Sequence, residues 1–104
     1  MKFYKNLYIG DTIRNPRKTR RKLKRHAKLQ NVYVIAYMEE SGHLSIYHNL
    51  MFQQCYYKEH PPYVIGIAGS HDEAVEIICR IAQESVRETG QADLTAYLLG
   101  RAMN

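Results

Sequence analysis

The densest group of chemically active side chains in this sequence is a run of basic residues near the N-terminus. Residues 14–28 hold nine of the fifteen Lys and Arg residues and no Asp or Glu. The formal net charge of +5 depends on this run, since the rest of the chain has six basic and ten acidic residues and nets −4. Because the charge is concentrated, it indicates a polyanionic or acidic partner more strongly than diffuse charge would.

The basic run is predicted to form a helix. Asn15 suits the N-cap and Pro16 the first helical position, so we expect a helix over residues 16–30. At about 100° per residue, eight cations then lie on an arc of roughly 200°. Leu23 and Ala27 lie on the narrow remaining face and are expected to dock the helix on the sheet. The predicted polyanion-binding residues are Arg17, Lys18, Arg20, Arg21, Lys22, Lys24, Arg25 and Lys28.

Three interpretations of this basic helix remain open. Nucleic-acid phosphates would offset the cost of like charges at i,i+4, such as Arg17 and Arg21. The same face would also fit an acidic protein, or it is an ordinary solvated surface. Base-specific recognition is not indicated, because the helix leads directly into a strand and lacks a helix-turn-helix frame. If nucleic acid binds, we expect contacts to its backbone with little readout of bases.

A second candidate is the turn in the stretch GIAGSHDE, which follows a predicted strand and opens a predicted helix. Folds of the α/β class often bind anions at this position. The sequence contains neither a dinucleotide fingerprint nor a P-loop there. Structural roles explain the same residues, because Ser70 with Glu73 forms a capping box and the glycines suit a turn and close packing. The candidate residues for an anion or small ligand are Gly66, Gly69, Ser70 and His71.

Residues that often ligate metals gather in the middle of the chain. They are His43, His48, His60, His71 and Cys55. Their spacing is not typical of a zinc site, and no Cys–His or Ser–His nucleophile pair is indicated. We therefore expect no metal and no cofactor, and a non-enzymatic protein is favoured over an enzyme. Tyr56 and Tyr57 would suit base stacking, although covering the edge of the core is the favoured explanation for them.

The strand patterns predict a small sheet. Residues 31–38 are apolar on both alternating faces, which is typical of a central strand covered on both sides. A turn and a second strand over residues 43–48 complete a hairpin, and residues 63–69 form a third apolar strand. Residues 1–12 are either an extended arm or a short extra strand.

The remaining elements are helices. A short helix capped by Asn49 is predicted over residues 49–59, a long one over 71–89 and a last one over 94–99. The expected order is helix-strand-strand-helix-strand-helix-helix. We therefore predict an α/β fold, bordering on α+β, with a small mixed sheet of about three strands and helices on both faces.

The long helix has an unusually wide apolar face. Its apolar residues span an arc of roughly 180°, and they are Ala74, Val75, Ile77, Ile78, Ile81, Ala82 and Val86. A surface helix needs only about 100°. This helix is therefore expected to bury its face against more than one element, or against a second subunit in a homodimer. A protein-interaction or regulatory module is thus the alternative to nucleic-acid binding.

Length and composition place the chain among single-domain globular proteins. A chain of 104 residues predicts one domain over residues 1–104, with 45% hydrophobic and 24% charged residues. Its two cysteines are too few for a disulfide scaffold and are expected to be reduced thiols. The start of the sequence lacks the apolar segment of a signal peptide, and no apolar run is long enough to span a membrane. These features favour a cytoplasmic protein without a membrane partner.

Two runs resemble known sequences. The stretches NVYVIAYMEESGHLSIYH and YVIGIAGSHDEAVEIICRIAQE look like short bacterial proteins of about 100 residues that carry no assigned function. The resemblance covers most of the chain and implies no activity, substrate or site residue. Small basic mRNA-cleaving toxins are similar in size and charge, but their order of elements differs from the one expected here.

Overall fold

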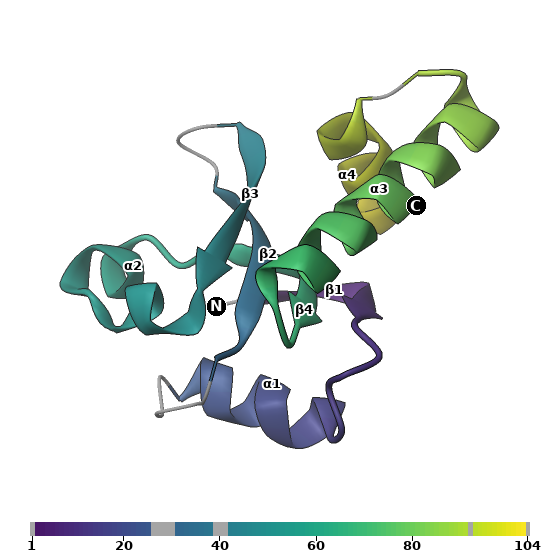
Figure 1. The fold of residues 1–104 in the computed structure, drawn as a ribbon. Helices are drawn as coiled ribbons and strands as arrows, with labels where there is room; N and C mark the ends of the chain where they lie inside the picture. The colour runs from purple at the N-terminus through teal and green to yellow at the C-terminus, as the bar shows by residue number, and fades with distance from the viewer. Residues whose placement is uncertain (1, 26–30, 39–41, 92, 104) are drawn as a thin grey trace.

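The structure is a computed structural model, and its described residues are 2–25, 31–38, 42–91 and 93–103. Four strands form one mixed sheet (Figure 1). β1 (Lys2–Ile9) runs parallel to β4 (Tyr63–Ala68), and β2 (Tyr33–Met38) runs antiparallel to both β4 and β3 (His43–His48). The predicted α/β fold class is confirmed, with one strand more than expected. The order across the sheet is β1-β4-β2-β3.

β2 is the central strand that its sequence predicted. Val34, Ile35 and Ala36 are all fully buried, although successive side chains point to opposite faces of the sheet. The pairing with β3 runs without a break from Tyr33 opposite His48 to Met38 opposite His43. A strand that is apolar on both sides requires a cover on each face, and helices provide it.

β1 resolves the alternative that the sequence left open for the first residues. It is a true strand at the edge of the sheet, not a loose arm. Between the pairs Phe3–Val64 and Tyr8–Gly66, β1 advances by five residues while β4 advances by two. The extra residues of β1 interrupt its regular hydrogen bonding with β4 and bend the edge strand, as β-bulges do.

One face of the sheet is covered by α3 (His71–Thr89) and α4 (Leu94–Met103). Ile77 and Ile81 of α3 pack there with Ile35 and Leu98 in one core cluster. Ser70 caps α3 by accepting a hydrogen bond from the Glu73 amide, and Gly90 ends it with a left-handed φ of 76°. Both ends of this helix were therefore predicted correctly.

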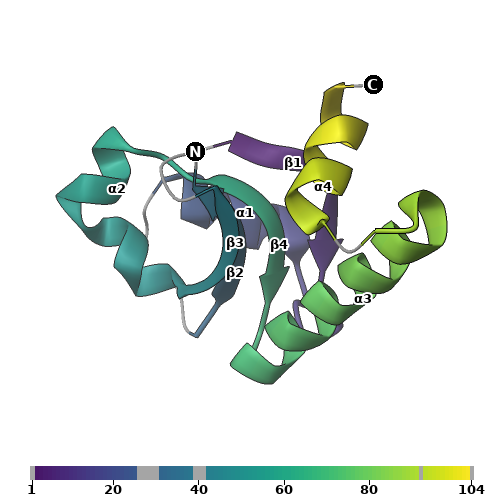
Figure 2. The same cartoon turned by 90° about the horizontal axis from the view of Figure 1, so that it is seen from above.

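The opposite face is covered by α1 (Pro16–Lys24) and the 3-10 turn η1 (Asn49–Gln53). Leu23 and Phe52 pack there with Val34 and Val64 in a second cluster. Figure 2 shows α1 and α3 on opposite sides of the sheet. The prediction of helices on both faces is thereby confirmed.

The single helix predicted over residues 49–59 is divided in two. η1 is followed by the short helix α2 (Cys55–Glu59). The cap is His48 instead of Asn49, because the His48 ring accepts from the Leu50 amide while the Asn49 side chain is buried and accepts from the Val32 amide at 3.2 Å. The side-chain oxygen of Asn49 is therefore bonded to the Val32 amide, just before β2, and does not cap the turn. Among the described helices, none combines the length and apolarity needed to cross a lipid bilayer.

Candidate nucleic-acid interface

The first turn of α1 forms as its sequence predicts. The side chain of Asn15 accepts a hydrogen bond from the Lys18 amide at 3.1 Å, and Pro16 occupies the first turn. The helix ends at Lys24, with Arg25 as its C-cap. The helix was predicted to continue to residue 30, but residues 26–30, including Ala27 and Lys28, lie outside the described residues.

Among the described residues of α1, Leu23 is the buried side chain that anchors the helix to the sheet. Leu23 is 3% exposed and packs into the cluster with Val32 and Phe52. Lys22 and Thr19 are half-buried beside it. The predicted docking through Leu23 is therefore correct, and it turns the other side of the helix toward solvent.

The cations predicted to bind a polyanion are brought together on that outer side. Lys22 is half-buried, and the six others within the described residues are exposed: Arg17, Lys18, Arg20, Arg21, Lys24 and Arg25. We refer to these six cations, together with the exposed Arg14 just before the helix, as the basic surface. No Asp or Glu occurs anywhere between residues 12 and 38 of the sequence. The helix thus presents a field of one sign without a compensating charge on its own segment.

Arg20 is held in place by β1. Its guanidinium carbon lies 5.0 Å from the centroid of the Phe3 ring. Such a cation–π contact contributes about 0.5–1 kcal/mol at an exposed site. It orients Arg20 toward the edge of the sheet while leaving the guanidinium exposed, so the N–H groups remain available to an acceptor.

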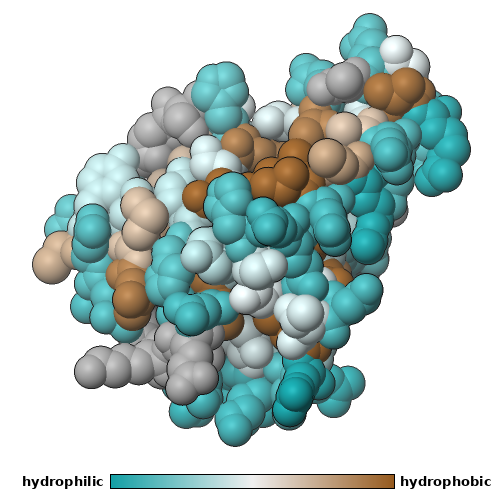
Figure 3. Space-filling model, viewed as in Figure 1, coloured by the Kyte–Doolittle hydropathy of each residue, from teal (hydrophilic) through white to brown (hydrophobic). Residues whose placement is uncertain are grey.

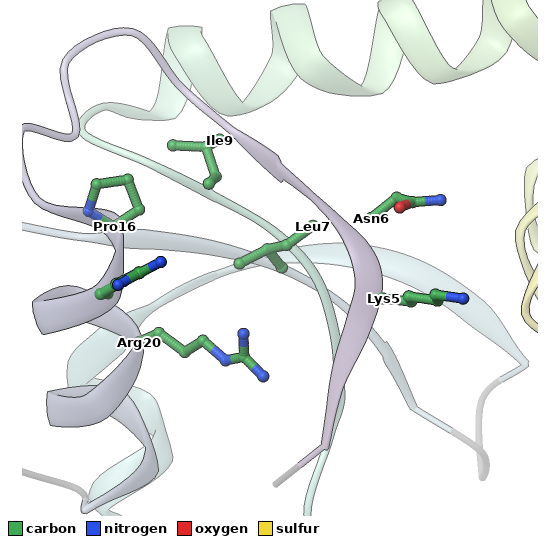
Figure 4. Close-up of a pocket in the computed structure, with 7 residues that line it drawn as sticks. Lys5, Asn6, Leu7, Ile9, Pro16 and Arg20 are labelled. Carbon is green, nitrogen blue, oxygen red and sulfur yellow. The ribbon is translucent and has the colours of Figure 1, made fainter.

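A pocket of about 350 Å³ lies between α1 and β1. In Figure 4, Leu7 and Ile9 point from β1 toward α1, and Arg20 reaches from α1 toward β1. Pro16 and Arg17 complete the helix side of the pocket. The pocket lining therefore combines apolar side chains with the guanidinium groups of Arg17 and Arg20, and Lys5 and Asn6 of β1 also line it. No local sequence pattern predicts this pocket, because it requires β1 to lie beside α1.

The turn at residues 66–71 is closed by groups of the chain itself. The Glu73 carboxylate accepts from the Gly69 amide at 2.8 Å and from the Thr12 hydroxyl at 2.7 Å. Partial burial raises the pKa of this carboxyl, but the hydrogen bonds from Gly69 and Thr12 outweigh it, so the pKa lies below its ordinary value. An internal carboxylate thus already occupies the Gly69 amide that an external anion would need.

The other residues of that turn have structural surroundings. A Cβ at Gly66 would lie 3.1 Å from the carbonyl oxygen of Tyr8 and 3.3 Å from a methyl group of Ile35. The exposed His71 ring packs edge-on against the Tyr33 ring, and the two ring centroids are 5.9 Å apart. Close packing explains Gly66, the approach of the Thr12 side chain explains Gly69 and the helix cap explains Ser70, which weakens the interpretation of this turn as a ligand site.

Two of the described histidines, His48 and His71, both pack against the Tyr33 ring. His48 lies at the end of its strand, where one ring nitrogen accepts from the Leu50 amide and the other lies 3.4 Å from the side-chain oxygen of Asn31. Within the described residues, no group of three His, Cys, Asp or Glu side chains is placed to hold a metal ion. Both cysteines, Cys55 and Cys79, are free thiols at the surface.

The two tyrosines of α2 have different roles. Tyr57 packs against Phe52 and Tyr47 at the edge of the core. Its pKa is raised by burial and by the neighbouring Tyr47 and Tyr56. Tyr56 is 49% exposed and stacks on His60 with centroids 4.6 Å apart. Of this pair, Tyr56 is therefore the one whose ring is largely exposed to solvent.

Comparisons with known proteins add no relative. No protein-family model matches the chain, and searches of curated proteins and of solved structures returned no match. Function must therefore be inferred from the residues of the chain itself.

Proposed function

We propose that the protein is a non-enzymatic nucleic-acid-binding module that uses the basic surface of α1. The observation that carries this proposal is the exposure of six cations along one capped helix, in a segment without acidic residues. Lys and Arg contacts to phosphates dominate the affinity of proteins for nucleic acids. The chain as a whole nets +5, so the basic surface would also steer a polyanion toward it.

The spacing of the cations supports a phosphate ligand over plain solubility. Arg17 with Arg21, and Arg21 with Arg25, are like charges at i,i+4, and each pair costs a few tenths of a kcal/mol in an isolated helix. Mixed charges would keep the helix soluble without this cost. A row of phosphates would neutralise the charges, so that the close spacing of the cations would favour the bound helix instead of destabilising it.

The pocket beside α1 supports a single strand over a duplex. A single strand offers bases and sugars that can rest on apolar surfaces, while a duplex presents mainly phosphates to a flat basic face. The apolar residues Leu7, Ile9 and Pro16 line the same pocket as Arg17 and Arg20. We therefore expect single-stranded RNA or DNA to bind more tightly than a duplex of equal length, with little sequence preference.

Fluorescence anisotropy with labelled single strands and duplexes at low salt tests this function. The triple variant Arg21→Glu, Lys24→Glu and Arg25→Glu should lose binding by at least about a hundredfold, since three phosphate contacts are lost and repulsion is added. A matched variant with Lys2→Glu, Lys58→Glu and Arg80→Glu changes the net charge equally but spares α1. It should keep most of the affinity, with circular dichroism confirming that both variants fold.

The outcomes separate the proposal from its alternative, an acidic protein partner at the same surface. If the unmutated protein binds no nucleic acid at low salt, the proposal fails and the acidic partner becomes the better explanation. If both triple variants lose binding equally, net charge and not the basic surface is responsible, and the proposal also fails. We further infer a reducing, cytoplasmic setting, because Cys55 and Cys79 are free thiols at the surface.

A further inference from the structure

An apolar stripe runs along the outer side of α3. The buried face of this helix consists of Ala74, Ile77, Ile81 and Ser85. A second apolar row lies beside it, formed by Val75, Cys79, Ala82 and Val86, which we call the α3 stripe. Val75 is 40% exposed and Val86 51% exposed. Cys79 is also exposed, and Ala82 is half-buried.

This stripe extends the core to the surface. Ile78, which is half-buried, connects it to the core cluster beneath, together with Leu44 and Ile46 of β3. Figure 3 shows apolar side chains reaching the surface beside α3 in the direction of β3. A shallow hollow lined by Ala82, Gln83, Val86 and Arg87 lies at the C-terminal half of the stripe. An exposed apolar surface that continues from the core is typical of an interaction site.

The spacing of the residues in the α3 stripe is the same from either end of the helix. Its members are separated by four, three and four residues, which is the spacing of the contact positions in a coiled coil. Valines stand at both ends, and the small residues Cys79 and Ala82 stand in the middle. A two-fold interface requires a surface that is complementary to itself, and a symmetrical row of this kind meets that requirement.

We propose that a second copy of the chain packs on this stripe, with the two α3 helices antiparallel. Val75 then contacts Val86 of the partner subunit, and Cys79 contacts the partner's Ala82. The small side chains at the centre let the two helix axes approach where they cross. The valines close the contact at both ends.

Charge supports the antiparallel direction. Glu76 and Arg87 are both exposed and lie on the same flank of the stripe, about 20° apart around the helix. In the antiparallel pair, Glu76 lies opposite the level of residue 85 in the partner subunit, within reach of the partner's Arg87. The two-fold axis repeats this contact. Parallel helices would instead place this flank of each subunit on opposite sides of the interface, so Glu76 would not reach Arg87 of the partner subunit.

The position of the stripe leaves the basic surface free. α1 and α3 cover opposite faces of the sheet, so copies joined through α3 keep their α1 helices apart. This matters because two chains of net charge +5 repel each other most where their cations meet. The inference does not depend on the proposed function, because the α3 stripe carries none of the cations of α1.

Sedimentation velocity over a range of protein concentrations provides the test. The unmutated protein should form dimers, weakly because the side chains in contact are small, and Val86→Asp should be monomeric throughout. Leu50→Asp is the matched control, because Leu50 is also 51% exposed but lies on η1. It should dimerise normally. A strictly monomeric unmutated protein, or equal loss of dimer in both variants, would overturn the proposal.

A charge exchange tests the direction of the helices. Glu76→Arg or Arg87→Glu alone should weaken the dimer several-fold, and the double variant should restore it, because each pair regains opposite charges. A bismaleimide should also cross-link Cys79 of two subunits in a Cys55→Ser background, since the antiparallel arrangement offsets these residues by three positions, or about 4.5 Å along the helix. No recovery in the double variant, or no cross-link, would refute the antiparallel pair.

Discussion

The carboxylate of Glu73 binds Thr12 through both the hydroxyl group at 2.7 Å and the backbone amide at 3.2 Å. The two residues are 61 positions apart, and their contact ties the loop after β1 to the first turn of α3. A Cβ at Gly10 would clash with this carboxylate, so the loop passes directly over it. The contact therefore connects the segment that leads into α1 with the helix on the opposite face.

Replacing Glu73 with Gln should destabilise the fold by about 1–2 kcal/mol, since hydrogen bonds to a charged, half-buried acceptor are lost or weakened. The free energy of unfolding of this variant should also fall less steeply as the pH is lowered. The pKa of Glu73 is lower in the folded chain than its ordinary value of 4.5. The stabilisation is thus fully present above 4.5 and disappears as the pH falls through the lower folded pKa.

Urea unfolding of both proteins between neutral and acidic pH measures this effect. Asp72→Asn is the control, because Asp72 is an exposed acid in the same helical turn. It should change stability by no more than about 0.5 kcal/mol. If the difference between Glu73→Gln and the unmutated protein stayed constant down to strongly acidic pH, the charged contact with Thr12 would not be stabilising.

The attachment of α1 depends on one leucine. Leu23→Ala should cost about 2–5 kcal/mol, because Leu23 is 3% exposed and its removal leaves a cavity among Val32, Val34 and Phe52. Leu50→Ala removes the same atoms from a side chain that is 51% exposed, and it should cost less than about 1 kcal/mol. Thermal or denaturant unfolding compares the two. Equal losses would show that α1 is not docked through Leu23.

The elements that could be predicted from sequence are those with strong local signals. Asn15 and Pro16 marked the start of α1, and Ser70 and Gly90 marked both ends of α3. Residues 33–38 are apolar on both faces, which predicted their central position in the sheet. Each of these signals depends on neighbours within a few residues, so no tertiary contact was needed to interpret them.

What could not be predicted depends on contacts between distant segments. The irregular pairing of β1 follows from its fit beside β4, and the pocket next to α1 exists only because β1 lies there. The helical wheel of α3 showed a wide apolar arc but not which part faces the sheet. Val75 and Val86 share that arc with Ile77 and Ile81, yet they are exposed while the isoleucines are buried.

Gly66 lies where three strands approach each other closely. It pairs with Tyr8 of β1 and Ile35 of β2, next to the register shift on each side. Gly66→Ala would bring a Cβ within 3.1 Å of the Tyr8 carbonyl oxygen, so it should cost about 1–3 kcal/mol. Amide hydrogen exchange in β1 should lose protection selectively. Gly42→Ala adds a Cβ in open space at a φ of 71°, so it should leave β1 protected despite its backbone strain.

The salt dependence of binding measures how many cations of the basic surface contact phosphates. A logarithmic plot of affinity against salt concentration falls by about 0.7 per neutralised phosphate for a single strand and about 0.9 for a duplex. Arg21→Gln should reduce the slope by one such step, because Arg21 lies at the middle of the exposed row. Lys58→Gln removes an exposed cation of α2 and should leave the slope unchanged. Equal slopes for Arg21→Gln and the unmutated protein would mean that α1 makes no phosphate contact through this residue.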